Sequence, residues 1–532
     1  MKKSILLLIS LCITMMLYAT APTTLSVVST AGGLSTAITV AGGTIATVTN
    51  LTVTGTIDAR DFKMMRDSMP VLAVVNLGAV NIAAYTGTGG TAGTGSTVYL
   101  DNVIPINAFY YKSSITSISL PITATSIGDS AFSGCYYLTS VTIYSSVISI
   151  GDNSFNYCDR LTTISIPSSV NSIRDNSFLY CTASIEVDAA NLNYSSQSGV
   201  LFNKTKTTLL HCYTHPSYTI PSSVTTIGNY AFAGCDYLYS ISIPSSVTTI
   251  GDYAFTNCCS LTSVTIPSSV TSIGEWAFSG GQYLNSVTIL SLLTTISAHI
   301  FDNCHALSLV TIPTTVTTIG DGAFNGCSSL TSIDLPTALD SIGGVAFGGC
   351  YNLTSFTIPS TVTTIGYFAL YDCRGLSTIT IPSSVTSISW NAFETCTGLT
   401  SIYANRIVPV DLSSYFSTDV FCGINKTTCI LHVPVGSLAL YQAADQWKDF
   451  LNIVDDLATT VNNTIADKVK VNIQNGQAIL TGVPVGELVT FYNLQGTAIY
   501  NQPASAETVT VNLPAHGVYV VRVGLESVKV VY

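Results

Sequence analysis

A phenylalanine that recurs at one constant interval constrains the fold of this 532-residue chain more than any other feature. Most successive members of the series are twenty-three positions apart. The step from Phe178 to Phe232 equals two repeats plus eight residues, and the step from Phe347 to Phe393 equals two repeats with Leu370 at its midpoint. A period between about 20 and 50 residues is typical of solenoids, in which one short unit stacks on the next. The intervals indicate about thirteen turns. The series is Phe109, Phe132, Phe155, Phe178, Phe232, Phe255, Phe278, Phe301, Phe324, Phe347 and Phe393.

Each unit has the pattern of a leucine-rich repeat. In residues 258–278, Leu261, Val264 and Ile266 follow the spacing Leu-x-x-Leu-x-Leu, which predicts a short strand. Pro267 ends this strand because proline cannot donate a ladder hydrogen bond. One turn buries about six apolar side chains at roughly 1.5–3 kcal/mol each, but ordering its backbone costs about 1–2 kcal/mol per residue. A turn therefore needs its neighbours, and we predict a mainly β leucine-rich-repeat solenoid.

The two ends of the repeat array differ from its middle. Asp58 precedes a short segment and is expected to cap a helix, and Ser437 is expected to cap a second helix with apolar positions as far as Leu451. Alternating residues after Asp467 predict a small β-sandwich. The expected divisions are a signal peptide at 1–21, an N-terminal capping region at 22–107, the solenoid at 108–400, a C-terminal cap at 401–455, a linker at 456–466 and the sandwich at 467–532.

The N-terminus and the charge balance bear on where the protein acts. Lys2 and Lys3, an apolar core and the small residues 19–21 form the pattern of a secretory signal peptide. No later apolar stretch reaches the ~20 residues of a membrane-spanning helix. The chain has 18 Lys and Arg against 29 Asp and Glu, without the basic clusters that bind phosphate backbones. We expect an exported protein that does not bind nucleic acid and has no transmembrane span.

The repeat unit LTSVTIPSSVTSIG-x-x-AF-x-x-C closely resembles the BspA-like, or treponemal-type, leucine-rich repeat of bacterial surface proteins, over about residues 50–455. Residues 467–532 resemble a type IX secretion C-terminal sorting domain, through Val489–Gly496, Leu513–Val523 and Val528–Val531. These resemblances imply export through that machinery, then anchoring on the outer membrane at the cell surface or release outside the cell. They also imply an adhesin-like role and carry no shared catalytic motif.

The expected binding surface is the concave face of the first strands. Its exposed positions carry Ser and Thr with Tyr nearby, a composition typical of adaptable protein-binding surfaces. The expected partners are proteins or glycans of host or neighbouring cells; a structural surface coat and a glycan-binding module are the alternatives. The positions are Ser140, Thr142, Tyr144, Thr163, Ser165, Ser240, Ser242, Ser263, Thr265, Ser286, Thr288, Ser332, Asp334, Ser355, Thr357, Thr378 and Thr380.

The sequence contains no nucleophile–base, phosphate-loop or paired-carboxylate motif, so we expect neither an enzyme nor a cofactor. Eleven of the fifteen cysteines share one repeat position and are expected to be buried free thiols, although stacked cysteines are close enough for bridging. Cys422 and Cys429 are expected to form a disulfide. The column is Cys135, Cys158, Cys181, Cys212, Cys235, Cys258, Cys304, Cys327, Cys350, Cys373 and Cys396.

Three further features are given structural interpretations. The histidines and cysteines of residues 211–215 and 299–305 lack a companion pair at zinc spacing, so no metal site is expected. Recurrent aspartates after glycine are expected to bond the local turn backbone, with a calcium ladder as the alternative. Residues 184–219 break the period and are expected to project as a surface loop. The aspartates are Asp129, Asp152, Asp252 and Asp321; the interruption carries Glu186, Asp188, Asn191, Tyr194, His211 and His215.

Overall fold

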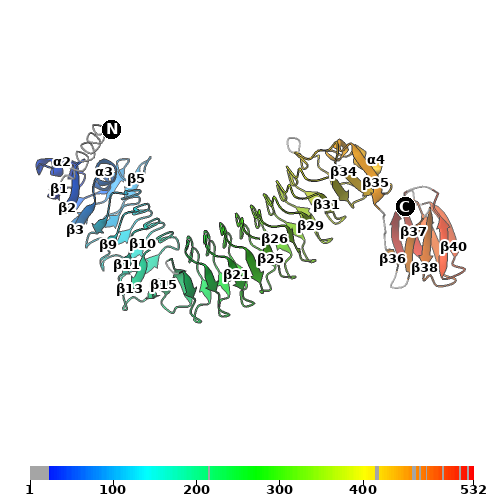
Figure 1. The fold of residues 1–532 in the computed structure, drawn as a ribbon, viewed down its shortest axis with the longest axis horizontal. Helices are drawn as coiled ribbons and strands as arrows, with labels where there is room; N and C mark the ends of the chain where they lie inside the picture. The colour runs from blue at the N-terminus through cyan, green and yellow to red at the C-terminus, as the bar shows by residue number, and fades with distance from the viewer. Residues whose placement is uncertain are drawn as a thin grey trace, which may run out of the picture. The chain divides into compact units, whose positions relative to one another are not determined.

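The computed structural model of the chain describes residues 23–213, 216–413, 419–457, 463–465, 469–474, 476–493, 497–514, 517–523 and 526–531. Short parallel strands repeat through most of these residues, and a small antiparallel sandwich follows them (Figure 1). The expected mainly β solenoid is confirmed. The described residues divide into two compact units, one within residues 1–293 and 300–306 and the other within residues 294–299 and 307–532. The expected signal peptide and most of the expected linker lie outside the described residues.

Long parallel strands begin the first unit. Strand β1 pairs with β2 and β2 with β3, and β3 then pairs with β7, the first repeat strand. The capping region and the repeats therefore share one continuous sheet. The elements are β1 (Thr23–Ser29), α2 (Leu34–Val40), β2 (Val48–Ile57), α3 (Ala59–Ser68), β3 (Val74–Ile82), β4 (Tyr85–Gly87) and β5 (Thr97–Tyr99).

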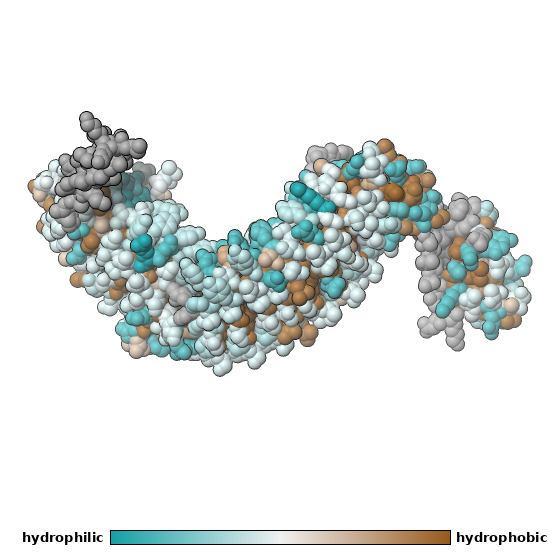
Figure 2. Space-filling view, in the orientation of Figure 1, coloured by the Kyte–Doolittle hydropathy of each residue, from teal (hydrophilic) through white to brown (hydrophobic). Residues whose placement is uncertain are grey.

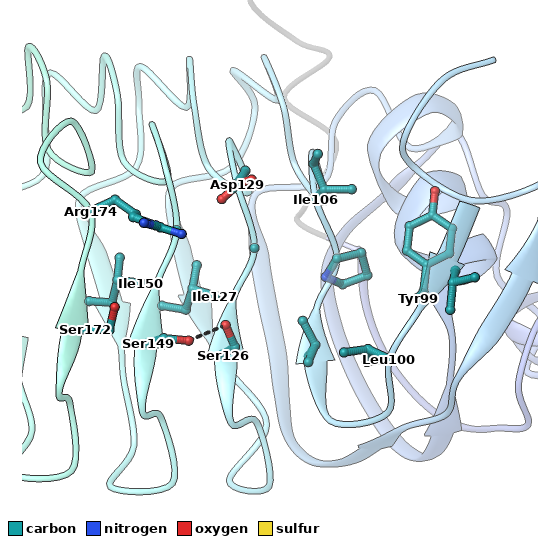
Figure 3. A pocket seen from close by; sticks show the side chains of 15 residues that line it. Tyr99, Leu100, Ile106, Ser126, Ile127, Asp129, Ser149, Ile150, Ser172 and Arg174 are labelled. Carbon is teal, nitrogen blue, oxygen red and sulfur yellow. Dashed lines mark hydrogen bonds between the residues drawn. The ribbon is translucent and has the colours of Figure 1, made fainter. Parts of the chain in front are cut away.

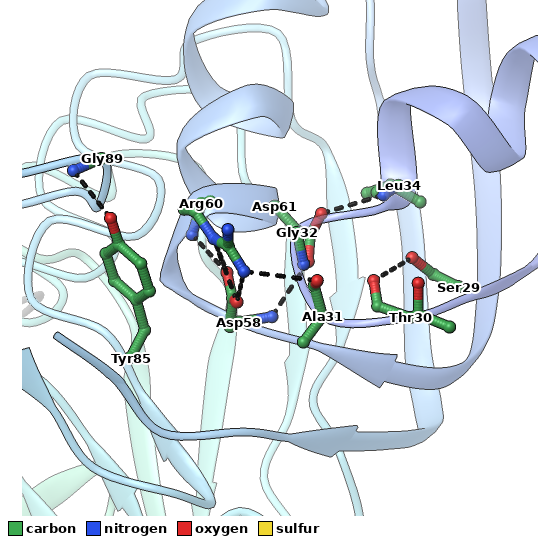
Figure 4. A network of polar contacts seen from close by, with 10 residues as sticks. All are labelled: Ser29, Thr30, Ala31, Gly32, Leu34, Asp58, Arg60, Asp61, Tyr85 and Gly89. Carbon is green, nitrogen blue, oxygen red and sulfur yellow. Dashed lines mark hydrogen bonds and ion pairs between the residues drawn. The ribbon is translucent and has the colours of Figure 1, made fainter. Parts of the chain in front are cut away.

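The N-cap expected at Asp58 is confirmed. Its carboxylate accepts a hydrogen bond from the Arg60 backbone N–H at 2.8 Å, and the Asp61 carboxylate accepts one from the Asp58 N–H at 3.0 Å. Asp61 also accepts from the N–H groups of Gly32 and Leu34 at 2.7 and 3.0 Å, where α2 begins (Figure 4). One buried carboxylate thereby joins the N-termini of two helices, which satisfies donors that a helix start leaves unpaired.

Lys112 caps the other end of α3. Its buried ammonium donates to the backbone oxygens of Arg66 and Met69 at 2.9 and 2.5 Å, and burial lowers its pKa. Lys112 precedes Cys135 by one full repeat and so occupies the cysteine position of the first turn. At this position the first turn binds a helix end, whereas later turns bind one another.

Most repeat turns contribute two short strands, and within each sheet these strands pair in parallel with the same strands of the next turn. Ser263 lies opposite Ser286 in the first strands, and Ser126 lies opposite Ser149 in the second. Because paired residues are one repeat apart, equivalent side chains stack in columns. The first strands are β7 (Ser117–Ser119), β9 (Ser140–Thr142), β11 (Thr163–Ile166), β13 (Ser184–Val187), β17 (Ser217–Thr219), β19 (Ser240–Ser242), β21 (Ser263–Ile266), β23 (Ser286–Ile289), β25 (Leu309–Thr311), β27 (Ser332–Ile333), β29 (Ser355–Phe356), β31 (Thr378–Ile381) and β33 (Ser401–Ala404). The second strands are β6 (Val103–Ile104), β8 (Ser126–Ile127), β10 (Ser149–Ile150), β12 (Ser172–Ile173), β18 (Thr226–Ile227), β20 (Thr249–Ile250), β22 (Ser272–Ile273), β24 (Thr295–Ile296), β26 (Thr318–Ile319), β28 (Ser341–Ile342), β30 (Thr364–Ile365) and β32 (Ser387–Ile388).

The third side of each turn is a run of tight turns in which successive N–H groups alternate between two kinds of partner. The Phe132 N–H donates to Ser154 O in the next turn at 2.8 Å, whereas the Ser133 N–H donates to Ser130 O in its own turn at 3.2 Å. Two residues per turn have positive φ in this run, here Ser130 at 53° and Gly134 at 74°. Bulkier side chains take these positions elsewhere, among them Tyr157, Tyr180, Tyr253, Trp276, Val345 and Phe368.

The predicted phenylalanine column lies in the core. Phe255 is 1% exposed, and its ring stacks between those of Phe232 and Phe278 at centroid distances of 4.9 and 5.0 Å. Leu370 is fully buried at the position expected from the period. Between Phe178 and Phe232 the backbone position of the phenylalanine is taken by Cys212, whose N–H donates to Ala231 O just as Phe109 N–H donates to Ala131 O, both at 2.7 Å.

Residues 184–219 do not project as a loop, so that expectation is wrong. Residues 194–211 form an antiparallel meander whose last strand, β16, pairs in parallel with β18 and so continues the sheet of second strands. The apolar run Val200–Phe202 is buried, and the buried Asn191 amide donates to Pro167 O and Val170 O at 2.8 and 2.9 Å. Burial of this run holds the segment in the stack. The strands are β14 (Tyr194–Gln197), β15 (Val200–Asn203) and β16 (Thr208–His211).

The C-terminal cap contains a shorter helix than expected. The Ser437 hydroxyl donates to Pro434 O at 2.7 Å and makes no hydrogen bond to the helix N-terminus, while Leu451 lies beyond the helix and is 72% exposed. The Trp447 indole, fully buried, donates to Val410 O at 2.9 Å and covers the apolar end of the stack. The elements are β34 (Ile430–Pro434), α4 (Leu438–Ala443), the 3₁₀ helix η1 (Trp447–Asp449) and β35 (Asn452–Leu457).

The C-terminal residues form two four-stranded sheets with their own core. The strand orders are β36-β37-β38-β41 and β40-β39-β42-β43, and all described pairings are antiparallel. Leu480, Phe491 and Val521 are fully buried between them. The strands are β36 (Asn463–Ile465), β37 (Val469–Gln474), β38 (Gln477–Thr481), β39 (Leu488–Tyr492), β40 (Ala498–Pro503), β41 (Thr508–Asn512), β42 (Val518–Val523) and β43 (Glu526–Val531).

Candidate binding surface

The hydroxyl-bearing residues expected to form a binding face all lie on one side of the first strands, and none of them is buried. Strand alternation is the reason: Val264 and Ile266 point into the core, so Ser263 and Thr265 point outward. The parallel register then places each outward residue beside its equivalent in the next turn, as with Ser263 and Ser286. We name this row of outward residues the hydroxyl face.

The surface of the repeats is weakly polar and carries few charges. Figure 2 shows pale tones over most of the visible repeat surface, the colour of weakly hydrophilic residues such as Ser and Thr, with scattered strongly hydrophilic and apolar residues between them. This agrees with a charged fraction of only 9% in the whole chain. A partner of such a surface is therefore recognised mainly by hydrogen bonds and ring contacts.

Tyrosines accompany the hydroxyl face on the segments that lead into the first strands. Tyr237, Tyr239 and Tyr283 are 63%, 56% and 64% exposed, which leaves large amphipathic surfaces free to contact a partner. Tyr137 is 49% exposed, and the Arg160 guanidinium lies 5.0 Å from its ring centroid. Exposed rings beside short hydroxyls lose little conformational entropy when they are covered.

The cysteines of the column are all free and buried, as expected. The Cys258 thiol donates to Phe232 O at 3.1 Å, and the Cys304 thiol donates to Phe278 O at 3.2 Å, so each thiol bonds the preceding turn. Burial raises the pKa of Cys135 and Cys350 to about 12, which keeps these thiols protonated as donors. Cys212 is also free and buried, but its backbone occupies the phenylalanine position of its turn.

The disulfide expected between Cys422 and Cys429 is wrong: both are free, the first exposed and the second buried. The expectation that the aspartates after glycine bond the backbone of their own turn is also wrong. Asp129 accepts a hydrogen bond from the Asp152 N–H of the next turn at 2.8 Å, and Asp321 accepts from the Gly344 N–H at 2.6 Å. These carboxylates therefore join neighbouring turns and leave the local turn backbone to other partners.

The histidines do not converge with other ligands. His211 is buried against Phe178, burial lowers its pKa to about 4, and its Nε2 has no hydrogen-bond partner. His215 and His516 lie outside the described residues. Within the part of the chain that the structure describes, no group of three or more His, Cys, Asp or Glu side chains is placed to hold a metal ion.

The repeats match the model of a known protein family. The profile of the BspA-type leucine-rich repeat region, which spans six copies, matches residues 102–211, 205–331 and 317–430, more than half of the chain. The chain belongs to the BspA-type leucine-rich repeat family. Solenoids of this kind present extended binding surfaces and serve typically as scaffolds for binding. In the described residues, none of the helices has the length and apolar character needed to cross a bilayer.

Solved structures of other leucine-rich repeat proteins are similar to this chain. One from Eubacterium ventriosum is 30% identical over 50% of this chain and 78% of its own, with a TM-score of 0.46. A leucine-rich cell surface protein from Faecalibacterium prausnitzii is 30% identical over 59% and 85%, with a TM-score of 0.38. One from Bacteroides ovatus is 25% identical over 64% and 89%, with a TM-score of 0.36. No curated protein matches the chain.

The sequence patterns did not predict two charged residues that stand at repeat positions. The glycine that follows the second strand, as in Gly128 and Gly151, is replaced by Arg174 in the fourth turn, and this arginine lines a groove. An arginine where other turns have glycine was the sequence signal for this site. Lys112, which stands at the cysteine position of the first turn, could have been found in the same way, by searching each repeat position for a charged residue that occurs only once.

Proposed function

We propose that this protein is an exported, surface-displayed scaffold that binds protein partners through its hydroxyl face, in the manner of an adhesin. The observation that carries the proposal is the row of outward Ser and Thr over buried Val and Ile in adjoining strands such as β21 and β23. Such a row offers donors and acceptors at the ~4.8 Å strand spacing. The similarity to a leucine-rich cell surface protein supports the location.

The test is a pair of charge substitutions on this face. Ser263→Glu with Thr288→Glu places two carboxylates on adjacent strands of the first unit, and a partner buried against them is expected to bind at least tenfold more weakly. Binding of the full chain to a panel of immobilised extracellular-matrix proteins and to whole cells measures the effect. Ser245→Glu with Ser268→Glu is the matched control, because both serines are exposed and lie off the strands. An unchanged binding profile of the Ser263→Glu, Thr288→Glu variant would contradict the proposal.

We also propose that residues 467–532 are a type IX sorting domain and that residues 1–21 are a signal peptide. The two-sheet sandwich with a separate core supports an autonomous C-terminal domain. The proposed divisions between them remain 22–107, 108–400, 401–455 and 456–466. Intact mass and protease accessibility of the protein on its own cells test this: a surface-exposed product that begins near Ala21 and lacks the tail is expected. A shielded product that retains Asp467–Tyr532 would contradict it.

A further inference from the structure

A groove of about 480 Å³ lies in the first unit beside the second strands β6, β8, β10 and β12, away from the hydroxyl face (Figure 3). Its apolar wall includes Tyr99 and Leu100 at the end of β5, and Leu100 is 62% exposed. Gly128 and Gly151 form part of its lining and leave it open because they carry no side chain. A neighbouring hollow of about 310 Å³ shares Arg174 with the groove and extends it.

Arg174 supplies the positive charge of this groove. Figure 3 shows its guanidinium extending from its own turn across the preceding turn, toward the side on which Asp129 lies. Arg174 is exposed, and among the described residues its side chain forms no hydrogen bond and no ion pair. A guanidinium recognises a carboxylate through two parallel hydrogen bonds. Asp152 and Asp175 line the hollow beside Arg174, but neither forms an ion pair with it, so its guanidinium is available to a ligand carboxylate.

Hydroxyl and carboxylate groups line the groove beside this charge. Ser126 and Ser149 share a hydrogen bond of 2.7 Å between their Oγ atoms, and Ser172 follows in the next turn (Figure 3). Asp129 accepts the Asp152 N–H through Oδ1, which leaves its second oxygen available. A row of hydroxyls at strand spacing with a carboxylate acceptor suits a ligand that itself carries many hydroxyl groups.

The backbone of the groove disfavours an added peptide strand. Ser149 pairs with both Ser126 and Ser172 in the parallel ladder, so β10 has no free edge. The Ile173 N–H of β12 donates to the Tyr194 hydroxyl at 2.9 Å, so this edge is also covered. A peptide that binds by strand addition needs unpaired backbone groups. At β10 and β12, recognition must therefore use side chains.

We propose that this groove binds an acidic oligosaccharide, in which a uronic or sialic acid unit places its carboxylate on Arg174. Ser126, Ser149, Ser172 and Asp129 then bond the sugar hydroxyls, while the apolar wall at Leu100, at the opposite end of the groove from Arg174, contacts the C–H face of a different sugar ring of the same oligosaccharide. The volume lies within the ~300–1,000 Å³ of small-molecule sites. The site does not involve the hydroxyl face, so this proposal is independent of the proposed protein binding.

The experiment is calorimetric titration of the full chain with a panel of oligogalacturonate, oligoglucuronate and sialylated oligosaccharides. At least one is expected to bind, and its carboxyl-reduced form is expected to bind about tenfold more weakly or worse, because a hydrogen bond to a charged group is lost. Arg174→Gln is expected to cause the same loss. Arg160→Gln is the matched control, since Arg160 is also exposed but lies over Tyr137 and does not line the groove.

Three outcomes would overturn the proposal. The first is that no member of the acidic panel binds. The second is that Arg174→Gln binds the acidic sugar as tightly as the unaltered chain does. The third is that acidic peptides bind with dependence on Arg174 while the sugars do not, which would assign the groove to a different class of ligand. Circular dichroism of both arginine variants checks that the fold is retained.

Discussion

Replacing one ring of the phenylalanine column tests whether stacked rings hold adjacent turns together. Phe255 is 1% exposed, and its ring stacks on those of Phe232 and Phe278 at centroid distances of 4.9 and 5.0 Å. Phe255→Ala therefore leaves a cavity between these two rings. Core Phe→Ala changes cost about 3–5 kcal/mol, and because both faces of the ring lose a partner, we expect about 4 kcal/mol.

Phe255→Leu is the matched control. Leucine is the residue found at Leu370 in the same column, where it is fully buried. The smaller change in volume is expected to cost about 1.5 kcal/mol or less. The contrast between alanine and leucine isolates the cavity from the loss of aromatic character.

Hydrogen exchange is the appropriate assay, because a repeat array does not unfold as a single two-state unit. The opening free energy of amides in residues 232–278 is expected to fall by about the full amount, and that of amides near Phe109 is expected to change little, since turns interact with their nearest neighbours. Equal effects of Phe255→Ala and Phe255→Leu would refute the argument that the cavity causes the loss of stability. A uniform fall along the first unit would refute its nearest-neighbour form.

Thiol titration of the folded chain should label the exposed Cys422 rapidly and the buried column only after unfolding; equal rates would contradict the ladder. Since burial raises the pKa of column thiols such as Cys135 to about 12, their stabilisation is complete below pH ~8.5 and declines as pH rises above it, which urea midpoints between about pH 7.5 and 10.5 would show. His211 has its pKa lowered to about 4, so stability should fall as pH drops from about 6.5 toward 4, and His211→Leu should flatten that fall in the same urea assay. Val345 has φ of 55°, where Asn153 and Asn391 stand in other turns, and Val345→Asn should stabilise by about 1 kcal/mol, seen as a higher melting temperature.

The period of the sequence was sufficient to predict the strands, the buried phenylalanine column and most of the thiol ladder. Each of these depends on a residue that recurs once per turn, so thirteen similar turns support the same conclusion. Cys212 shows where this reasoning failed. Spacing placed it with the other cysteines, but backbone hydrogen bonds place it in the phenylalanine column, because the meander lengthens one turn and shortens the next.

Features that occur once were harder to predict than features that repeat. The buried run Val200–Phe202 was an apolar signal for a strand, but it stood in a segment already interpreted as a loop. Asp129 follows glycine as a turn residue does, yet its partner lies in the next turn, a relation that no local rule specifies. The groove depends on Arg174 at a glycine position, and only the packed turns bring Leu100 and Ser126 beside it.

The alternation of hydrogen bonds on the third side of each turn bears on how such a gene can change. Every second N–H in that run, such as Phe132 N–H, bonds the following turn at the same offset, and the columns beneath it are filled by near-identical side chains. A duplication of any single repeat unit between the meander and the C-terminal cap would therefore insert a turn whose two faces already match its neighbours. Recombination within the repeats can lengthen or shorten the array in steps of one turn without any compensating mutation.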